Sequence, residues 1–125
     1  RRSGDRNYFL MILVVDDDAR IRTATAGALS AMGHEVLSAS DGTEALTICS
    51  SRNDIQLVVT DVLMPGMRGP DFIARVHAER PELRVIYMSG DIGDTPPEAF
   101  GGWPLLPKPF TAASLSEVVG QALAG

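Results

Sequence analysis

Carboxylate, hydroxyl and ammonium side chains follow four separate apolar stretches of the 125-residue chain. Asp16 and Asp17 come directly after one apolar run, and Asp61 comes directly after another. Ser89 ends a third apolar stretch, and Lys108, the only lysine of the chain, follows a fourth. Carboxylate oxygens suit Mg²⁺, whereas a hydroxyl and an ammonium can bind the oxygens of a phosphoryl group. These residue types therefore indicate phosphoryl transfer assisted by a divalent ion.

The elements that must position these side chains follow from the apolar patterns. Short apolar runs predict strands at residues 8–15, 35–39, 55–60, 83–88 and 103–106. Helical spacing of apolar residues predicts helices at residues 18–33, 40–52, 70–80 and 111–123. The stretch 91–102 holds two prolines and three glycines, so we expect the fourth helix to be short or irregular.

Strands and helices alternate along the whole chain, and the connections are short. This alternation predicts a single (βα)5 domain of the α/β class with a parallel sheet. The carboxyl ends of parallel strands share one edge, where open α/β sheets bind their ligands. We therefore expect the acids, Ser89 and Lys108 to converge there. Residues 1–7 are polar and lack periodicity, so we expect them to form a linker or leader before a domain at residues 8–125.

Composition excludes several classes of protein. The net charge of −5 argues against nucleic acid as a direct ligand. The single cysteine, Cys49, excludes an internal disulfide and fits a reducing compartment. The longest apolar run, residues 8–15, is far shorter than the roughly 20 residues of a membrane span. We expect a cytoplasmic protein without a membrane segment.

Four motifs carry a resemblance to a known family: Val-Val-Asp-Asp-Asp at 14–18, Thr-Asp-Val-Leu-Met-Pro-Gly at 60–66, Met-Ser-Gly at 88–90 and Leu-Pro-Lys-Pro-Phe at 106–110. The chain resembles the receiver domain of two-component response regulators from Leu10 to Leu123. The resemblance implies a flavodoxin-like sheet with strand order 2-1-3-4-5. The Arg-rich leader and the end of the chain after the last helix favour the carboxyl-terminal receiver of a hybrid histidine kinase.

The resemblance also implies residue roles in a metal and phosphoryl pocket. Asp61 would be the phosphoacceptor. Asp16, Asp17 and Asp61 would bind Mg²⁺ together with the backbone carbonyl of Leu63. Such a domain assists its own phosphorylation and dephosphorylation and is a regulatory module rather than an enzyme.

Further implied roles concern the switch that follows phosphorylation. Ser89 and Lys108 would contact the phosphoryl oxygens, and the peptide bond before Pro109 would be cis. Family members carry an aromatic residue three positions before the lysine, where this chain has Leu105. Trp103 lies two residues earlier, so we expect that Trp103, or no aromatic residue, serves as the switch.

The resemblance also implies which partners the domain binds. The phosphoryl donor would be the phosphohistidine of a histidine kinase or of a histidine phosphotransfer domain. A homodimer would form through the face made by the fourth helix, the fifth strand and the last helix. Neither nucleic acid nor a membrane is expected to bind the domain directly.

The sequence is also compatible with three other functions. A phosphatase of the haloacid dehalogenase type would also use Asp16 and Asp18, but Asp61 would then have no role. A receiver that folds alike and is never phosphorylated is the second. A dinucleotide-binding half-domain is the third, although the turn after residue 15 lacks glycines. We expect His34 and His77 to be solvated surface residues and Cys49 to be a small buried apolar residue.

Overall fold

Five parallel strands form one sheet in the order β2-β1-β3-β4-β5, which confirms the predicted fold class. The computed structural model describes residues 9–124, so the leader expected at residues 1–7 lies outside the described residues. The strands are β1 (Met11–Val15), β2 (Glu35–Ala39), β3 (Leu57–Asp61), β4 (Arg84–Ser89) and β5 (Leu105–Pro107).

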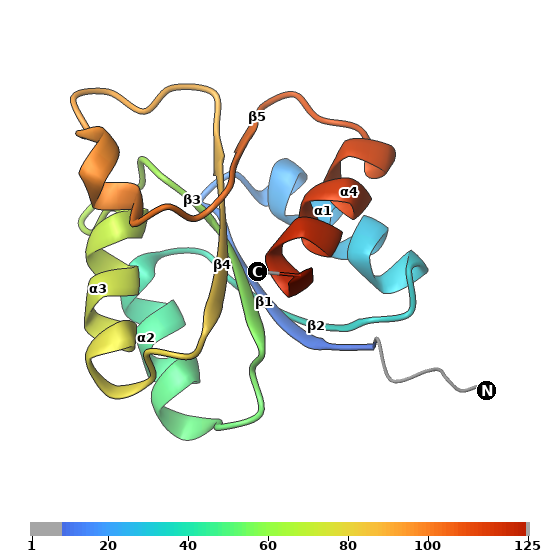
Figure 1. Cartoon of the computed structure of the whole chain (residues 1–125), viewed down its shortest axis with the longest axis horizontal. Helices are drawn as coiled ribbons and strands as arrows, with labels where there is room; N and C mark the ends of the chain where they lie inside the picture. Colours follow the sequence, from blue (N-terminus) through green and yellow to red (C-terminus); the bar gives the residue numbers. More distant parts are fainter. Residues whose placement is uncertain (1–8, 125) are drawn as a thin grey trace.

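Four helices and one 3₁₀ turn connect and cover the strands. They are α1 (Ala19–Ala31), α2 (Gly42–Ser51), α3 (Gly69–Glu79), η1 (Pro97–Phe100) and α4 (Ala112–Ala124). The sheet stands between two layers, with α2 and α3 on one face and α1 and α4 on the other (Figure 1). Within residues 9–124, no helix has the length and apolar character needed to cross a membrane.

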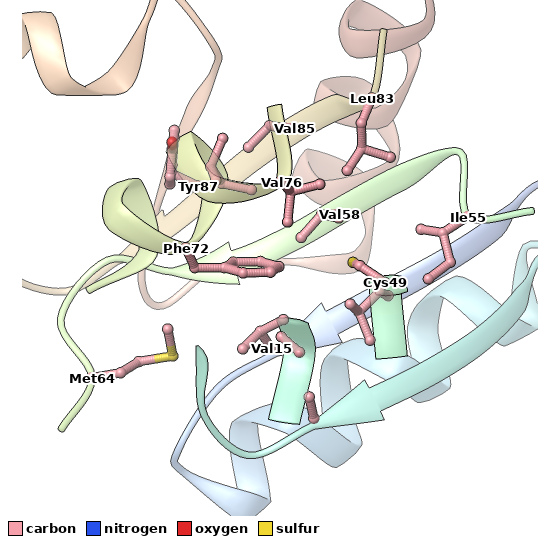
Figure 2. Packing of buried hydrophobic residues seen from close by; sticks show 14 of the residues in the cluster. Val15, Cys49, Ile55, Val58, Met64, Phe72, Val76, Leu83, Val85 and Tyr87 are labelled. Carbon is pink, nitrogen blue, oxygen red and sulfur yellow. The ribbon is translucent and has the colours of Figure 1, made fainter. Parts of the chain in front are cut away.

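The continuous apolar run of β1 is explained by burial on both faces. Leu13 and Val15 belong to the cluster under α2 and α3, whereas Ile12 and Val14 belong to the cluster under α1 and α4. Figure 2 shows the first cluster, where Phe72 of α3 packs toward the sheet. Burying one such side chain contributes about 1.5–3 kcal/mol. The two clusters therefore hold the strand, and the acids that follow it, in place from both sides.

The fourth helical element is short, as predicted. The η1 turn spans four residues, between Pro96 and Gly101. Proline restricts the start of the turn, and Gly101 ends it in a left-handed conformation with φ of 61°. An edge-to-face contact between Phe100 and Tyr87, with ring centroids 5.1 Å apart, anchors the turn to β4.

The limits of three strands differ from the predicted ones. The predicted start of the first strand at residue 8 lies outside the described residues. Within them, β1 begins at Met11, and the Leu10 N–H donates to His34 Nδ1. β3 is shifted to Leu57–Asp61, so that Asp61 is its last residue. β5 begins at Leu105 rather than at 103, because the Trp103 N–H donates to the Phe100 carbonyl in a turn.

The predictions for α1 and for the histidines need correction, whereas Cys49 is buried in the core as expected. The apolar spacing in residues 18–33 predicts one buried face made by Ile21, Ala24, Thr25, Ala28, Leu29 and Met32. Only Thr25 and Leu29 of these are buried, and a groove of about 510 Å³ separates part of α1 from the start of α4. His34 and His77 are not freely solvated. Both are half-buried, and each ring forms a hydrogen bond with the backbone, at 3.0 Å to the Leu10 N–H and at 2.8 Å to the Leu83 carbonyl.

Candidate phosphoryl and metal site

Asp16 and Asp17 emerge together from β1 but lie in different environments. Asp16 is fully buried, and its Oδ1 atom accepts a hydrogen bond of 2.9 Å from the Asp18 N–H. Asp17 is exposed. Asp18 caps α1 by accepting from the N–H groups of Arg20 and Ile21, which turns the chain away from the sheet edge. The sharp turn leaves both acids at the carboxyl end of the strand.

Asp61 ends β3 with only 7% of its surface exposed. Its Oδ1 atom accepts from the Val62 N–H at 2.9 Å. Gly69, the first residue of α3, packs against the Asp61 backbone so closely that a Cβ atom there would overlap the carbonyl oxygen. Glycine at position 69 therefore lets the helix begin next to the end of β3.

The structure brings the three acids and the lysine together. Asp16, Asp17 and Asp61 each offer a carboxylate oxygen, and these oxygens lie within 4.8 Å of one another. Lys108 Nζ lies 2.8 Å from Asp16 Oδ2 and 3.4 Å from Asp61 Oδ1. Three carboxylates thus face one ammonium in a partly buried pocket. This donor set of hard oxygens with excess negative charge fits a divalent ion such as Mg²⁺.

Burial and the neighbouring charges shift the pKa values of the pocket. Burial, and then the charge of Asp16, raise the pKa of Asp61 to about 6, although Lys108 and the Val62 N–H act in the opposite direction. Burial acts to lower the pKa of Lys108, but the hydrogen bond to Asp16 and the charge of Asp61 outweigh it, so that this pKa is raised. Lys108 is therefore a permanent cation of the pocket, while the carboxylates carry unbalanced charge.

Ser89 lies at the end of β4 and is tied to the neighbouring loop. Its Oγ atom accepts from the Asp91 N–H at 3.0 Å and donates to the Asp91 carbonyl. The Ser89 carbonyl accepts from the Lys108 N–H at 2.9 Å, which fixes the lysine backbone beside the pocket. The Lys108–Pro109 peptide bond is cis.

The remaining residues named from the sequence lie around or away from these groups. Leu63 is half-buried in the loop after β3, where its side chain faces the backbone of Gly93. Leu105 is 39% exposed on β5. Trp103 packs against His77 near the end of α3, with ring centroids 5.9 Å apart. Asp61 instead lies at the opposite end of α3, where the Gly69 backbone packs against it.

Two arginines of the site were not identified from the sequence. Arg22 Nη1 donates to the Asp16 carbonyl at 2.7 Å, and Arg68 Nη1 pairs with Asp94 Oδ1 at 2.7 Å. Arg22 lies one turn after the Asp18 cap, which is the only sequence signal for its contact. Arg68 has no such signal, because its partner lies 26 residues further along the chain.

Comparison with known proteins agrees with this geometry. The family described as "Response regulator receiver domain" matches residues 12–120. The regulator NtrC of Azospirillum brasilense is 39% identical over 116 residues, which cover 90% of this chain and 24% of that protein. The sensor kinase CckA of Brucella abortus is 33% identical over 128 residues, which cover 98% of this chain and 13% of that protein.

A solved structure shows the same arrangement of elements. The receiver domain of a response regulator protein from Clostridium thermocellum superposes with a TM-score of 0.83 at 33% identity, covering 93% of this chain and 95% of that one. This chain spans about a quarter of the length of NtrC. The chain belongs to the response regulator receiver family and is a phosphorylatable regulatory module with the acidic pocket of phosphoaspartate signalling.

Proposed function

We propose that Asp61 accepts a phosphoryl group from the phosphohistidine of a histidine kinase or of a histidine phosphotransfer domain. The observation that carries this proposal is the convergence of Asp16, Asp17, Asp61 and Lys108, from three separate segments, on one pocket. An Asp61 oxygen attacks phosphorus while the phosphorus–nitrogen bond of the donor breaks, and the histidine nitrogen takes the electron pair.

Each side chain of the pocket has one task in this transfer. Asp16, Asp17 and Asp61 would hold Mg²⁺ with the backbone carbonyl of Leu63. The ion would neutralise charge on the phosphoryl oxygens when bound. Lys108 contacts Asp61 before transfer and remains close enough to pair with a phosphoryl oxygen afterwards.

The Ser89 hydroxyl would bind the phosphoryl group in the signalling state. Either Trp103 or no aromatic residue would serve as the switch near β5 that responds to phosphorylation. The tryptophan packs on His77 rather than on the pocket, and this contact supports the version without a switch aromatic. Unchanged Trp103 fluorescence on addition of a phosphoryl analogue would agree with that version.

Phosphorylation by acetyl phosphate tests the proposal. With Mg²⁺, the wild-type chain gains the mass of one phosphoryl group, and Asp61→Asn does not. Asp54→Asn is the matched control, because Asp54 is an exposed acid paired with Arg52 away from the pocket. A wild-type chain that stays unmodified, with and without a histidine kinase, would make the domain a receiver that is never phosphorylated.

The haloacid dehalogenase interpretation predicts a different result. In that interpretation Asp61 has no role, whereas the structure places its carboxylate 3.4 Å from Lys108 and beside Asp16. Hydrolysis of a phosphomonoester such as p-nitrophenyl phosphate distinguishes the two functions. A receiver gives no turnover with this substrate.

The face made by η1, β5 and α4 is the proposed site of a homodimer. Among the described residues, Leu105 and Phe9 are the large apolar side chains that are exposed, and Leu105 lies on the edge strand of this face. Sedimentation velocity of the chain with and without beryllium fluoride and Mg²⁺ tests the dimer. A monomer in both conditions would contradict it.

We also propose a cytoplasmic location and a parent protein of the hybrid kinase type. The single buried cysteine fits a reducing compartment. The receiver domain of the hybrid histidine kinase CckA is among the similar proteins, as is the regulator NtrC, so the proposal of a hybrid kinase rests on the sequence expectation. The domain composition of the full-length gene product tests whether the parent protein is a hybrid kinase.

A further inference from the structure

Arg68 joins the two loops that border the pocket. Its Nη1 atom lies 2.7 Å from Asp94 Oδ1 and donates to Thr95 Oγ1 at 3.2 Å. Arg68 belongs to the loop that follows Asp61, whereas Asp94 and Thr95 belong to the loop that follows Ser89. Both loops leave the sheet at the end where β3 and β4 finish (Figure 1). The bridge therefore connects the phosphoacceptor side of the pocket with the hydroxyl side.

The Ser89 hydroxyl is held by the loop to which Arg68 binds. Its Oγ atom donates to the Asp91 carbonyl and accepts from the Asp91 N–H at 3.0 Å. A serine hydroxyl has a single hydrogen to donate. To bind a phosphoryl oxygen on Asp61, Ser89 must therefore release the Asp91 carbonyl. Movement of Oγ toward the pocket also deprives the Asp91 N–H of its acceptor.

Hydrogen bonds continue from Asp91 to the far end of the loop. Asp91 Oδ1 accepts from the Gly93 N–H at 2.8 Å, and the Thr95 N–H donates to the Ile92 carbonyl at 3.1 Å. Thr95 is buried, with 8% of its surface exposed, and it receives the Arg68 hydrogen bond. If the loop rearranged to give the Asp91 N–H and carbonyl new hydrogen-bond partners, the contacts between Asp91 and Thr95 would have to change. The Arg68 bridge opposes such a rearrangement.

We infer that Arg68 is a positioning residue that holds the 91–95 loop in the arrangement that retains the Ser89 hydroxyl, and thereby lowers the affinity of the pocket for a phosphoryl group. The inference rests on the proposed function of Asp61 and Ser89. A contact present in only one of two arrangements shifts the equilibrium toward that arrangement. One exposed ion pair with a hydrogen bond corresponds to about a two- to fivefold change in affinity.

Titration with beryllium fluoride at saturating Mg²⁺, followed by NMR, measures this affinity. Arg68→Ala should bind the analogue about two- to fivefold more tightly than the wild type, and Asp94→Asn should shift the affinity in the same direction. Arg75→Ala is the matched control, because Arg75 is an exposed arginine of α3, the helix that begins directly after Arg68, and this variant should bind like the wild type. Urea unfolding verifies that each variant is folded.

A Ser89→Ala background separates positioning from a general structural effect. If Arg68 acts through Ser89, Arg68→Ala leaves the affinity of the Ser89→Ala chain unchanged. The same gain in both backgrounds would overturn the inference, and so would an Arg68→Ala chain that binds no more tightly than the wild type. Failure of the wild type to bind the analogue would instead overturn the proposed function, and the inference with it.

Discussion

At the scale of single residues, the pocket holds more negative than positive charge and is partly shielded from water. Asp16 is fully buried and Asp61 nearly so, while Lys108 is the cation that contacts both. Burying like charges next to each other destabilises the ionised state of at least one of them. Burial first, and then the charge of Asp16, raise the pKa of Asp61 to about 6, and the same excess of negative charge would favour a bound divalent ion.

The raised pKa of Asp61 predicts a pH-dependent gain of stability for Asp61→Asn in the absence of metal. Between the ordinary pKa of 3.8 for an aspartate and the raised pKa of about 6, the folded chain binds more protons at this site than the unfolded chain. The stability of the wild type therefore falls as the pH rises through this window. At pH 7.5 in EDTA we expect Asp61→Asn to be more stable by on the order of 2–3 kcal/mol.

Thermal unfolding at several pH values checks this prediction. The difference in Tm between the two chains should be large at pH 7.5 and should nearly close by about pH 4, below which Asp61 is protonated in both states. Asp54→Asn serves as the control, since Asp54 has a lowered pKa through its exposed partner Arg52. A wild type that is the more stable chain at pH 7.5 would contradict the electrostatic account.

At the scale of elements, the start of α3 is positioned by contact with the end of β3. The Gly69 N–H donates to the Val62 carbonyl at 2.8 Å, and the glycine backbone lies against Asp61. Phe72, three residues later, anchors the same helix in the core (Figure 2). The helix and Asp61 therefore cannot shift independently.

Two glycine substitutions test this contact. Gly69→Ala should destabilise the chain by roughly 1–3 kcal/mol, because its Cβ would meet the rigid Asp61 carbonyl. Gly27→Ala is the matched control in the interior of α1, where an added Cβ meets nothing within 4 Å. This control should gain about 0.5–1 kcal/mol through helix propensity. Urea unfolding measures both free energies, and equal effects would refute the close contact.

At the scale of the whole molecule, the parallel sheet and its two helical layers bring all pocket segments to one edge (Figure 1). Residues 92 positions apart, Asp16 and Lys108, form a direct ion pair there. An ion that binds this folded pocket and not the unfolded chain stabilises the whole domain. Metal binding, protonation of Asp61 and folding are therefore linked.

Magnesium should raise the Tm of the wild type, and Asp17→Asn should weaken this effect. Asp17 is exposed, so its substitution removes one proposed ligand while leaving the metal-free Tm nearly unchanged. We expect the apparent Mg²⁺ affinity to fall by about tenfold or more. Tm measured against MgCl2 concentration at pH 7.5 tests this, and a wild type that does not respond to Mg²⁺ would contradict the proposed metal site.

Lowering the pH provides a second measurement of the same linkage. Protonation of Asp61 would remove a proposed metal ligand, so the Tm gain from Mg²⁺ should shrink as the pH falls below about 6. A gain that stays constant from pH 7.5 to pH 5 would show that Asp61 does not take part.

The amino-acid sequence by itself determined the strand order through the family resemblance, and the positions of the acids, Ser89 and Lys108 at strand ends. The strand-end positions depend on local patterns, because apolar runs predict buried strands and charged residues after them must leave the core. The short η1 turn was predictable for the same reason, because its prolines and glycines act on the local backbone.

Only the tertiary structure decided which partners the polar side chains take. The Arg68–Asp94 bridge and the hydrogen bond between His77 and Leu83 depend on where separate segments meet. The attachment of Ser89 to Asp91 depends on the path of a loop that has no regular pattern. Hydrophobic periodicity reports which face of an element is buried, but the hydrogen-bonding partners of exposed and half-buried groups arise from contacts that no local pattern records.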